Sequence, residues 1–139
     1  MTLQEHLFNT LLHLAPKAKK VVLAVSGGSD SVALLRLFEF NKRNQFENIV
    51  VAHFDHALRE SSAQDALFVE NLCQKLNIPF YTERQIVANI AQENKWNLED
   101  AARRLRYTFL TKVAKQIKAD AILTAHTLDD QAETVLMQL

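Results

Sequence analysis

Only one cysteine, two glycines and two prolines occur in this 139-residue sequence. The single Cys73 excludes an intrachain disulfide and a metal site built from cysteines alone, and its setting on a predicted helix is typical of a small core residue. The sequence has no internal repeat, no low-complexity segment and no linker rich in proline or glycine. We therefore expect one domain over residues 1–139, large enough to bury a core.

Long apolar runs and an excess of one charge are also missing. No stretch approaches the roughly 18 consecutive apolar residues of a membrane-spanning helix, and the amphipathic N-terminal segment contains an acid and does not resemble an export signal. We therefore expect a cytoplasmic protein without a membrane partner. Sixteen basic and sixteen acidic residues give a formal net charge of zero, so binding to a nucleic acid would require a local basic patch.

Apolar runs of strand composition alternate with helical periodicity along the chain. This alternation, with strands apolar nearly throughout, predicts an α/β fold in which helices cover both faces of a parallel sheet. In such sheets ligands bind beyond the carboxyl ends of the strands. The predicted strands are residues 21–25, 49–53, 78–81 and 121–124, and the predicted helices are residues 2–14, 31–43, 61–76, 87–93, 97–118 and 128 onward.

Both glycines, Gly27 and Gly28, fall in the turn SGGSDS between the first predicted strand and the following helix. Without Cβ atoms, they let backbone N–H groups approach an anion, and the helix N-terminus adds a partial positive charge. The turn therefore predicts a phosphate cradle, and Asp30 fits there if Mg²⁺ links it to the phosphates. The alternative is an ordinary turn in which Ser29 or Asp30 caps the helix.

Two further segments carry histidine or arginine clusters. HFDHALRES contains His53, Asp55, His56 and Arg59 at a strand end, which fits a nucleotide or substrate loop or, alternatively, a zinc site. NLEDAARRLRY begins a long helix, with Asn97 as its expected cap. Glu99, Arg103, Arg106 and Tyr107 share one helical face, which either binds phosphate or is a solvated face carrying a Glu–Arg pair, and Arg104 is turned about 100° away.

The last segment, AHTLDDQAET, places Asp129, Asp130 and Glu133 at the start of the final predicted helix. Acidic residues are favourable at a helix N-terminus, so helix capping is one interpretation. Coordination of a metal or orientation of a substrate amine is the other.

The SGGSDS turn resembles the PP-loop of ATP pyrophosphatases, which cleave ATP between its α and β phosphates. The four segments, in this order over residues 21–139, resemble the N-terminal domain of the bacterial tRNA(Ile)-lysidine synthases. The resemblance implies a Rossmann-like adenine nucleotide alpha hydrolase fold. It also implies an ATP-dependent ligase that adenylates the wobble cytidine of isoleucine tRNA and then replaces AMP with free lysine, forming lysidine.

The resemblance assigns roles residue by residue. It implies catalytic roles for Asp30, Arg103 and Asp130, with Asp30 holding Mg²⁺. Contacts to ATP are implied for Ser26, Gly27, Gly28, Ser29, Asp30, Ser31, His53, Asp55 and His56. Contacts to tRNA, lysine or ATP are implied for Arg59, Asn97, Glu99, Arg103, Arg106, His126, Asp129, Asp130, Gln131 and Glu133.

The sequence departs from the family at two places. Thr127 stands where many relatives carry a second histidine, and the family motif continues past Leu139 into tRNA-binding domains. We therefore expect a truncated catalytic domain, with an ATP-binding fragment that lacks turnover as the alternative to full activity, and with a homodimer as one assembly. The rivals are an amide-forming PP-loop ligase, a nucleotide sensor, and a tRNA thiolase, which would need cysteines that the chain does not place in these loops.

Overall fold

The structure is a computed structural model that describes residues 19–25, 48–125 and 134–138. Three helices and five strands lie within these ranges, and none of the described helices is long and apolar enough to cross a membrane. In chain order the elements are β1 (Lys20–Ala24), β2 (Asn48–Asp55), α3 (Ser62–Leu76), β3 (Phe80–Arg84), α4 (Val87–Asn94), α5 (Leu98–Ile117), β4 (Ala121–Ala125) and β5 (Thr134–Gln138).

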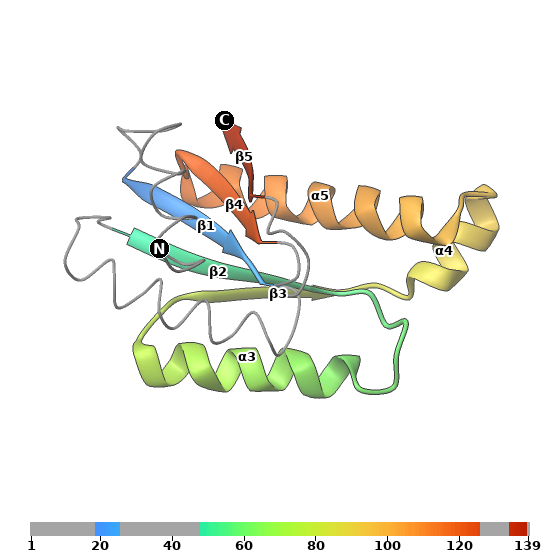
Figure 1. The fold of residues 1–139 in the computed structure, drawn as a ribbon, viewed down its shortest axis with the longest axis horizontal. Helices are drawn as coiled ribbons and strands as arrows, with labels where there is room; N and C mark the ends of the chain where they lie inside the picture. The colour runs from blue at the N-terminus through green and yellow to red at the C-terminus, as the bar shows by residue number, and fades with distance from the viewer. Residues whose placement is uncertain (1–18, 26–47, 126–133, 139) are drawn as a thin grey trace.

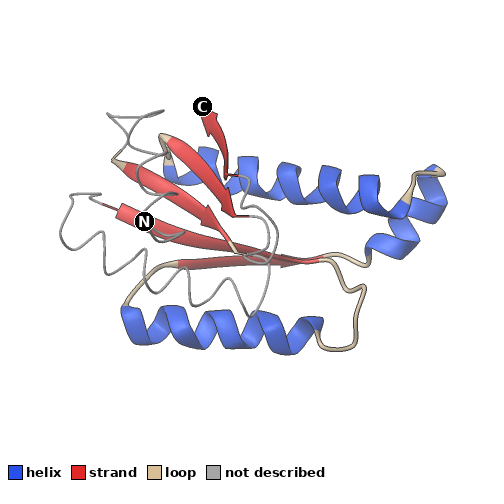
Figure 2. Ribbon diagram, viewed as in Figure 1, coloured by secondary structure: helices blue, strands red, loops and turns tan. Residues whose placement is uncertain are grey.

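The strands form one sheet in the order β3-β2-β1-β4-β5. The pairs β3–β2, β2–β1 and β1–β4 are parallel, whereas β5 is antiparallel to β4. Figures 1 and 2 show α3 on one face of the sheet and α4 with α5 on the other. The predicted α/β class is therefore confirmed, with β5 as an added antiparallel edge strand.

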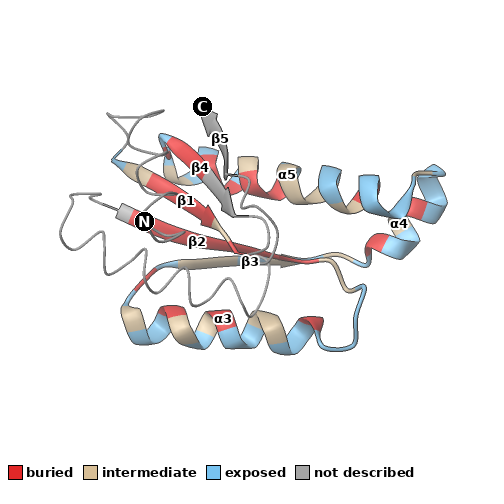
Figure 3. Cartoon of the chain, in the orientation of Figure 1, coloured by how far each residue is buried: buried red, intermediate tan, exposed pale blue. Residues whose placement is uncertain are grey.

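The core follows from the two-residue period of β2. The cluster under α4 and α5 includes Val50, Ala52 and Phe54. Since side chains alternate along a strand, His53 and Asp55 lie on its opposite face. The Phe54 ring meets Phe109 of α5 at a centroid distance of 6.0 Å. Figure 3 shows buried residues along β1 and β2 between helices whose outward sides are exposed, whereas β3 is only partly buried.

Helix α5 has a side-chain cap at its start and a left-handed residue at its end. The Asn97 side-chain oxygen accepts a hydrogen bond from the Glu99 N–H at 2.9 Å, as predicted for a cap. Lys118 ends the helix with φ 57° and ψ 49°. The buried face of α5 consists of Ala101, Phe109, Leu110, Val113 and Ala114, which is wider than a single apolar stripe, whereas Leu98 is exposed.

The predicted helix from residue 128 onward is wrong over Thr134–Gln138, which forms β5. Thr134 and Val135 are β-branched, and such residues favour strands. The segment pairs along the edge of β4, from Thr134 opposite Ala125 to Gln138 opposite Ala121. The predicted helices at residues 2–14 and 31–43, and residues 128–133 of the last one, lie outside the described residues.

The bounds of all four predicted strands differ from those in the structure, by no more than one residue at either end for β1 and β4 and by more for β2 and β3. The third strand is Phe80–Arg84 instead of residues 78–81, because it begins after Pro79, which has no N–H to donate to the sheet. The second strand runs to Asp55 instead of stopping at His53. His53 and Asp55 therefore belong to the sheet itself, where both are buried.

The start of β1 is tied to the turn between α5 and β4. The Asp120 carboxylate accepts hydrogen bonds from the backbone N–H groups of Lys19 at 2.9 Å and Lys20 at 3.0 Å. The Asp120 N–H in turn donates to the Lys20 carbonyl at 2.8 Å, and the Lys20 ammonium donates to the Ile117 carbonyl at 3.0 Å. The hydrogen bonds from Lys20 and Lys19 lower the pKa of the Asp120 carboxyl below its usual value.

Candidate functional site

The carboxyl ends of β1 and β2 bring the second predicted segment next to the start of the glycine turn. Val25 continues β1 by one residue, and its N–H donates to the Ala52 carbonyl of β2 at 3.0 Å. Ser26 follows directly in the sequence. Ser26, Gly27, Gly28, Ser29, Asp30, Ser31, His126, Asp129, Asp130, Gln131 and Glu133 lie outside the described residues, so their roles stay predictions.

His53 is almost completely buried, with 2% of its surface exposed. Its Nδ1 lies 2.7 Å from the Val25 carbonyl oxygen. A carbonyl oxygen only accepts hydrogen bonds, so Nδ1 is the donor. The side chain of one strand therefore holds the backbone of its neighbour at the point where the glycine turn begins.

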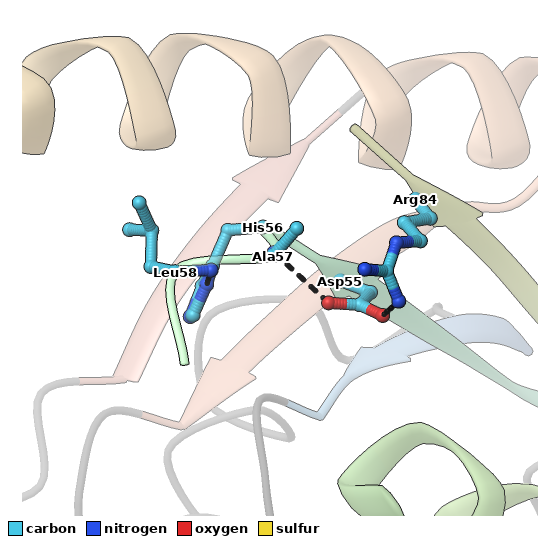
Figure 4. Close-up of polar contacts among 5 residues, drawn as sticks. All are labelled: Asp55, His56, Ala57, Leu58 and Arg84. Carbon is cyan, nitrogen blue, oxygen red and sulfur yellow. Dashed lines mark hydrogen bonds and ion pairs between the residues drawn. The ribbon is translucent and has the colours of Figure 1, made fainter. Parts of the chain in front are cut away.

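Asp55 is buried at the last position of β2, and both of its carboxylate oxygens have partners (Figure 4). Oδ1 accepts from the Ala57 N–H at 3.0 Å, and Oδ2 pairs with the Arg84 guanidinium at 3.4 Å. Ala57 has a left-handed φ of 54°, so the chain turns sharply away from the sheet here. The carboxylate closes this turn while its charge is balanced by Arg84.

Arg84 was not among the predicted site residues. The third strand was expected to end at residue 81, which left Arg84 without a place at the sheet edge. In the structure Arg84 lies opposite Asp55 in the parallel register of β2 and β3. The signal in the sequence was a basic residue a few positions after an apolar run, which is too common to identify an ion pair.

His56 lies just beyond β2 and is partly buried. Its Nδ1 accepts from the Leu58 N–H at 3.1 Å (Figure 4), so in the neutral ring the hydrogen is on Nε2. Burial, with further contributions from the positive charges of Arg59 and Arg106, lowers the pKa of His56, although Asp55 acts in the opposite direction. The lowered pKa favours the neutral form of the His56 ring, and Arg59 and Arg106 lie in its surroundings.

The basic side chains separate into paired and unpaired groups. Arg84 pairs with Asp55, Arg104 pairs with Asp100 at 2.9 Å, and Lys112 pairs with Glu83 at 2.5 Å. Within the described ranges, three arginine side chains have neither a hydrogen bond nor an ion pair. These are Arg59, Arg103 and Arg106.

Arg106 is the most constrained of the three. Its Nε is buried and has no hydrogen-bond partner in the part of the chain that is described. The guanidinium groups of Arg106 and Arg103 lie 5.4 and 5.6 Å from the centre of the Tyr107 ring. A partly buried, unpaired guanidinium is costly to keep without an anion, so Arg106, with Arg59 and His56 in the same surroundings, is suited to a phosphate or carboxylate.

The remaining predictions on α5 have mixed outcomes. Glu99 and Arg103 are exposed, and the ion pair on the helix joins Asp100 to Arg104, which also lies 4.9 Å from the Trp96 ring centre. A zinc site at His53, Asp55 and His56 has no support, because no three His, Cys, Asp or Glu side chains of the described residues are placed so that they could hold a metal ion together. The binding roles of Asn97, Glu99 and Arg103 are not tested and stay predictions.

Known proteins resemble this chain in sequence and in fold. Over 129 residues it is 57% identical to a tRNA(Ile)-lysidine synthase from Thermus thermophilus, and the match covers 93% of this chain and 24% of that protein. Over 131 residues it is 50% identical to a protein of the same name from Deinococcus deserti, again covering 93% and 24%. The chain thus spans about a quarter of the length of these curated relatives.

A solved structure supports the fold. The U34-tRNA thiolase NcsA from Methanococcus maripaludis superposes with a TM-score of 0.71 at 18% identity, covering 91% of this chain and 45% of that one. The PP-loop domain family matches residues 2–139. Its match contains the glycine turn that the sequence places directly after β1. The chain therefore belongs to the family of ATP-binding PP-loop domains.

Proposed function

We propose that the protein is an ATP-dependent ligase that joins free lysine to the wobble cytidine of isoleucine tRNA, forming lysidine. The structural observation that carries the proposal is Arg106, whose buried Nε has no hydrogen-bond partner among the described residues and whose charge, with that of Arg59, acts on His56 just beyond β2. The shared identity with relatives called tRNA(Ile)-lysidine synthase supports the choice of reaction. Membership in a PP-loop family supports ATP as the energy source.

The chemistry needs two transfers. The carbonyl oxygen of cytosine attacks the α-phosphorus of ATP, and pyrophosphate leaves. The side-chain amine of lysine then attacks the ring carbon that bears this oxygen, and AMP leaves. Both leaving groups are anionic, so the guanidinium groups of Arg59, Arg103 and Arg106 would stabilise charge as it develops on them.

The other residues follow the resemblance. The amides of residues 26–31 would hold the phosphates, with Asp30 holding Mg²⁺ to reduce their repulsion. His126, Asp129, Asp130, Gln131 and Glu133 would bind lysine, and Asp130 would accept the proton that its amine loses before attack. Glu99 and Asn97 would contact tRNA or ATP. We also propose a cytoplasmic location and regard a homodimer as one assembly.

Neither the fold match nor the single cysteine supports the thiolase alternative. Its fold likeness to NcsA lies below 25% identity and concerns the fold alone. Cys73, the single cysteine of the sequence, is fully buried on α3, and burial raises the pKa of its thiol to about 11. A buried, protonated thiol supplies neither a nucleophile nor a cluster ligand.

Pyrophosphate release tests the proposal directly. The protein, alone and joined to the additional sequence of its longer relatives, would be incubated with ATP, Mg²⁺, lysine and isoleucine tRNA carrying a wobble cytidine. We expect pyrophosphate release that depends on tRNA, and incorporation of labelled lysine into the tRNA by the longer protein. ATP binding without pyrophosphate release from any combination would instead identify a nucleotide sensor.

A further inference from the structure

We propose that His53 is a positioning residue, which holds the end of β1 in place through the Val25 carbonyl and does not itself contact the nucleotide. The inference rests on the proposed function only in its choice of ATP as the ligand to be positioned. It differs from the role that the family resemblance implies for His53, which is a direct contact to ATP.

The first observation concerns the point where β1 leaves the sheet. The Val25 N–H donates to the Ala52 carbonyl, as it does in a continuing parallel ladder. In such a ladder the Val25 carbonyl would next accept from a backbone N–H of β2. Among the described residues, its only donor is the His53 side chain at 2.7 Å. The His53 side chain therefore takes the place of the last backbone hydrogen bond between β1 and β2.

The second observation is burial. Val25 is 5% exposed and His53 is 2% exposed, so water does not readily replace this hydrogen bond. A buried carbonyl left without a donor is unfavourable, and the backbone would relieve that cost by moving. His53 thus determines the direction in which the chain leaves β1, one peptide before Ser26.

The third observation explains why this histidine can reach its partner. Because β2 continues to Asp55, His53 lies within the strand opposite Thr82 of β3, on the face away from Phe54. Its backbone is fixed by pairing on the β3 side, and its ring extends toward β1. The Val25 carbonyl requires the hydrogen on Nδ1, which leaves Nε2 without the hydrogen in the neutral ring.

Two amide variants separate positioning from direct contact. The side-chain nitrogen of asparagine occupies the place of Nδ1, whereas that of glutamine reaches the place of Nε2. We expect His53→Asn to keep the dissociation constant for ATP within about threefold, and His53→Gln and His53→Ala to weaken binding by about tenfold or more. Thermal unfolding of each variant would accompany the titrations, because rescue by asparagine must occur in a folded protein.

Three results would overturn the inference. Binding retained by His53→Gln and lost by His53→Asn would assign a ligand contact at Nε2. Normal ATP binding in all three variants would show that the hydrogen bond from His53 to the Val25 carbonyl has no effect on ATP binding. Equal loss in all three would show that the Nδ1 hydrogen bond is not what matters.

A second measurement does not depend on ATP. Nitrogen NMR of the imidazole in the ligand-free protein should show His53 with its hydrogen on Nδ1. The opposite tautomer would contradict the hydrogen bond from His53 to the Val25 carbonyl and so overturn the inference. If the wild-type protein fails to bind ATP, the proposed function fails. The effect of the His53 hydrogen bond on the backbone is then measured by the amide NMR shift of Val25. This shift should change in His53→Gln and be retained in His53→Asn.

Discussion

His56 reports, at the scale of single residues, whether an anion occupies the basic surface. Its pKa is lowered by burial and by Arg59, with smaller effects of His53 and Arg106 and an opposing one of Asp55. A bound phosphate would offset the two arginines and raise this pKa. We expect an NMR titration to show a higher His56 pKa with ATP than without it, and an unchanged pKa would contradict phosphate binding beside this ring.

The same lowered pKa makes the stability of the folded protein depend on pH. The unfolded state binds a proton at His56 more readily than the folded state does, so stability rises with pH through this group. The contribution of the neutral His56 ring to stability is fully present above the unfolded pKa of 6.5. It is lost as the pH falls from there toward the lower pKa of the folded protein. In His56→Gln, which does not titrate, the decline of stability over this window should be smaller in denaturant titrations.

Arg106 and Arg104 form a matched pair on α5. Arg104 is exposed and already paired with Asp100, whereas Arg106 has a buried Nε without a partner among the described residues. We expect Arg106→Gln to weaken binding of ATP or tRNA by about tenfold, and Arg104→Gln to leave it unchanged. Equal effects of the two substitutions would mean that only the overall positive charge of the helix matters.

Cys73 should be unreactive in the folded protein. The residue is fully buried on α3, and burial raises its pKa to about 11. At about pH 8 we expect a thiol reagent to label Cys73 at a rate limited by opening of the protein, and to label it rapidly in denaturant. Fast labelling under native conditions would contradict the packing of α3 against the sheet.

At the scale of elements, the cap of α5 separates a structural role of Asn97 from a binding role. Asn97→Ala removes the hydrogen bond to the Glu99 N–H and should lower the free energy of unfolding by about 1 kcal/mol, measured in denaturant. Asn97→Ser preserves a capping oxygen and should restore most of that stability. If Asn97→Ser is stable but binds substrate poorly, the contact implied by the family resemblance is present as well.

Local pattern predicted the types of most elements but not all of their bounds. Val21, Val22 and Leu23 make β1 a continuous apolar run, and α5 has both a cap and a periodic face, so both elements were readable from the sequence. β5 was not, because the acids before Thr134 are typical of a helix start and its pairing with β4 is a tertiary contact. The Asp55–Arg84 pair and the contact of His53 with Val25 were missed for the same reason, since both need the strand register.

At the scale of the whole molecule, Asp120 joins the start of the central strand to the far end of α5. Its folded pKa is lowered, so its contribution to stability is complete above the unfolded pKa near 3.8 and is lost as the pH falls through the folded value. We expect Asp120→Ala to lower the free energy of unfolding by about 1 kcal/mol at pH 7, because two exposed hydrogen bonds are lost. The difference from wild type should shrink in strong acid, and a constant difference would contradict the role of the ionised carboxylate.

The central place of β1 in the sheet has a consequence for synthesis of the protein on the ribosome. β1 is made before its two neighbours, and the contact between Lys20 and Asp120 joins positions 100 residues apart. At about 5–20 residues per second, some 5–20 seconds pass between the translation of β1 and that of β4. During this interval the edge of β1 that β4 later covers offers unpaired backbone groups to other strands. A translational pause before residue 121 would therefore lengthen the period in which this edge of the nascent chain can pair with other chains.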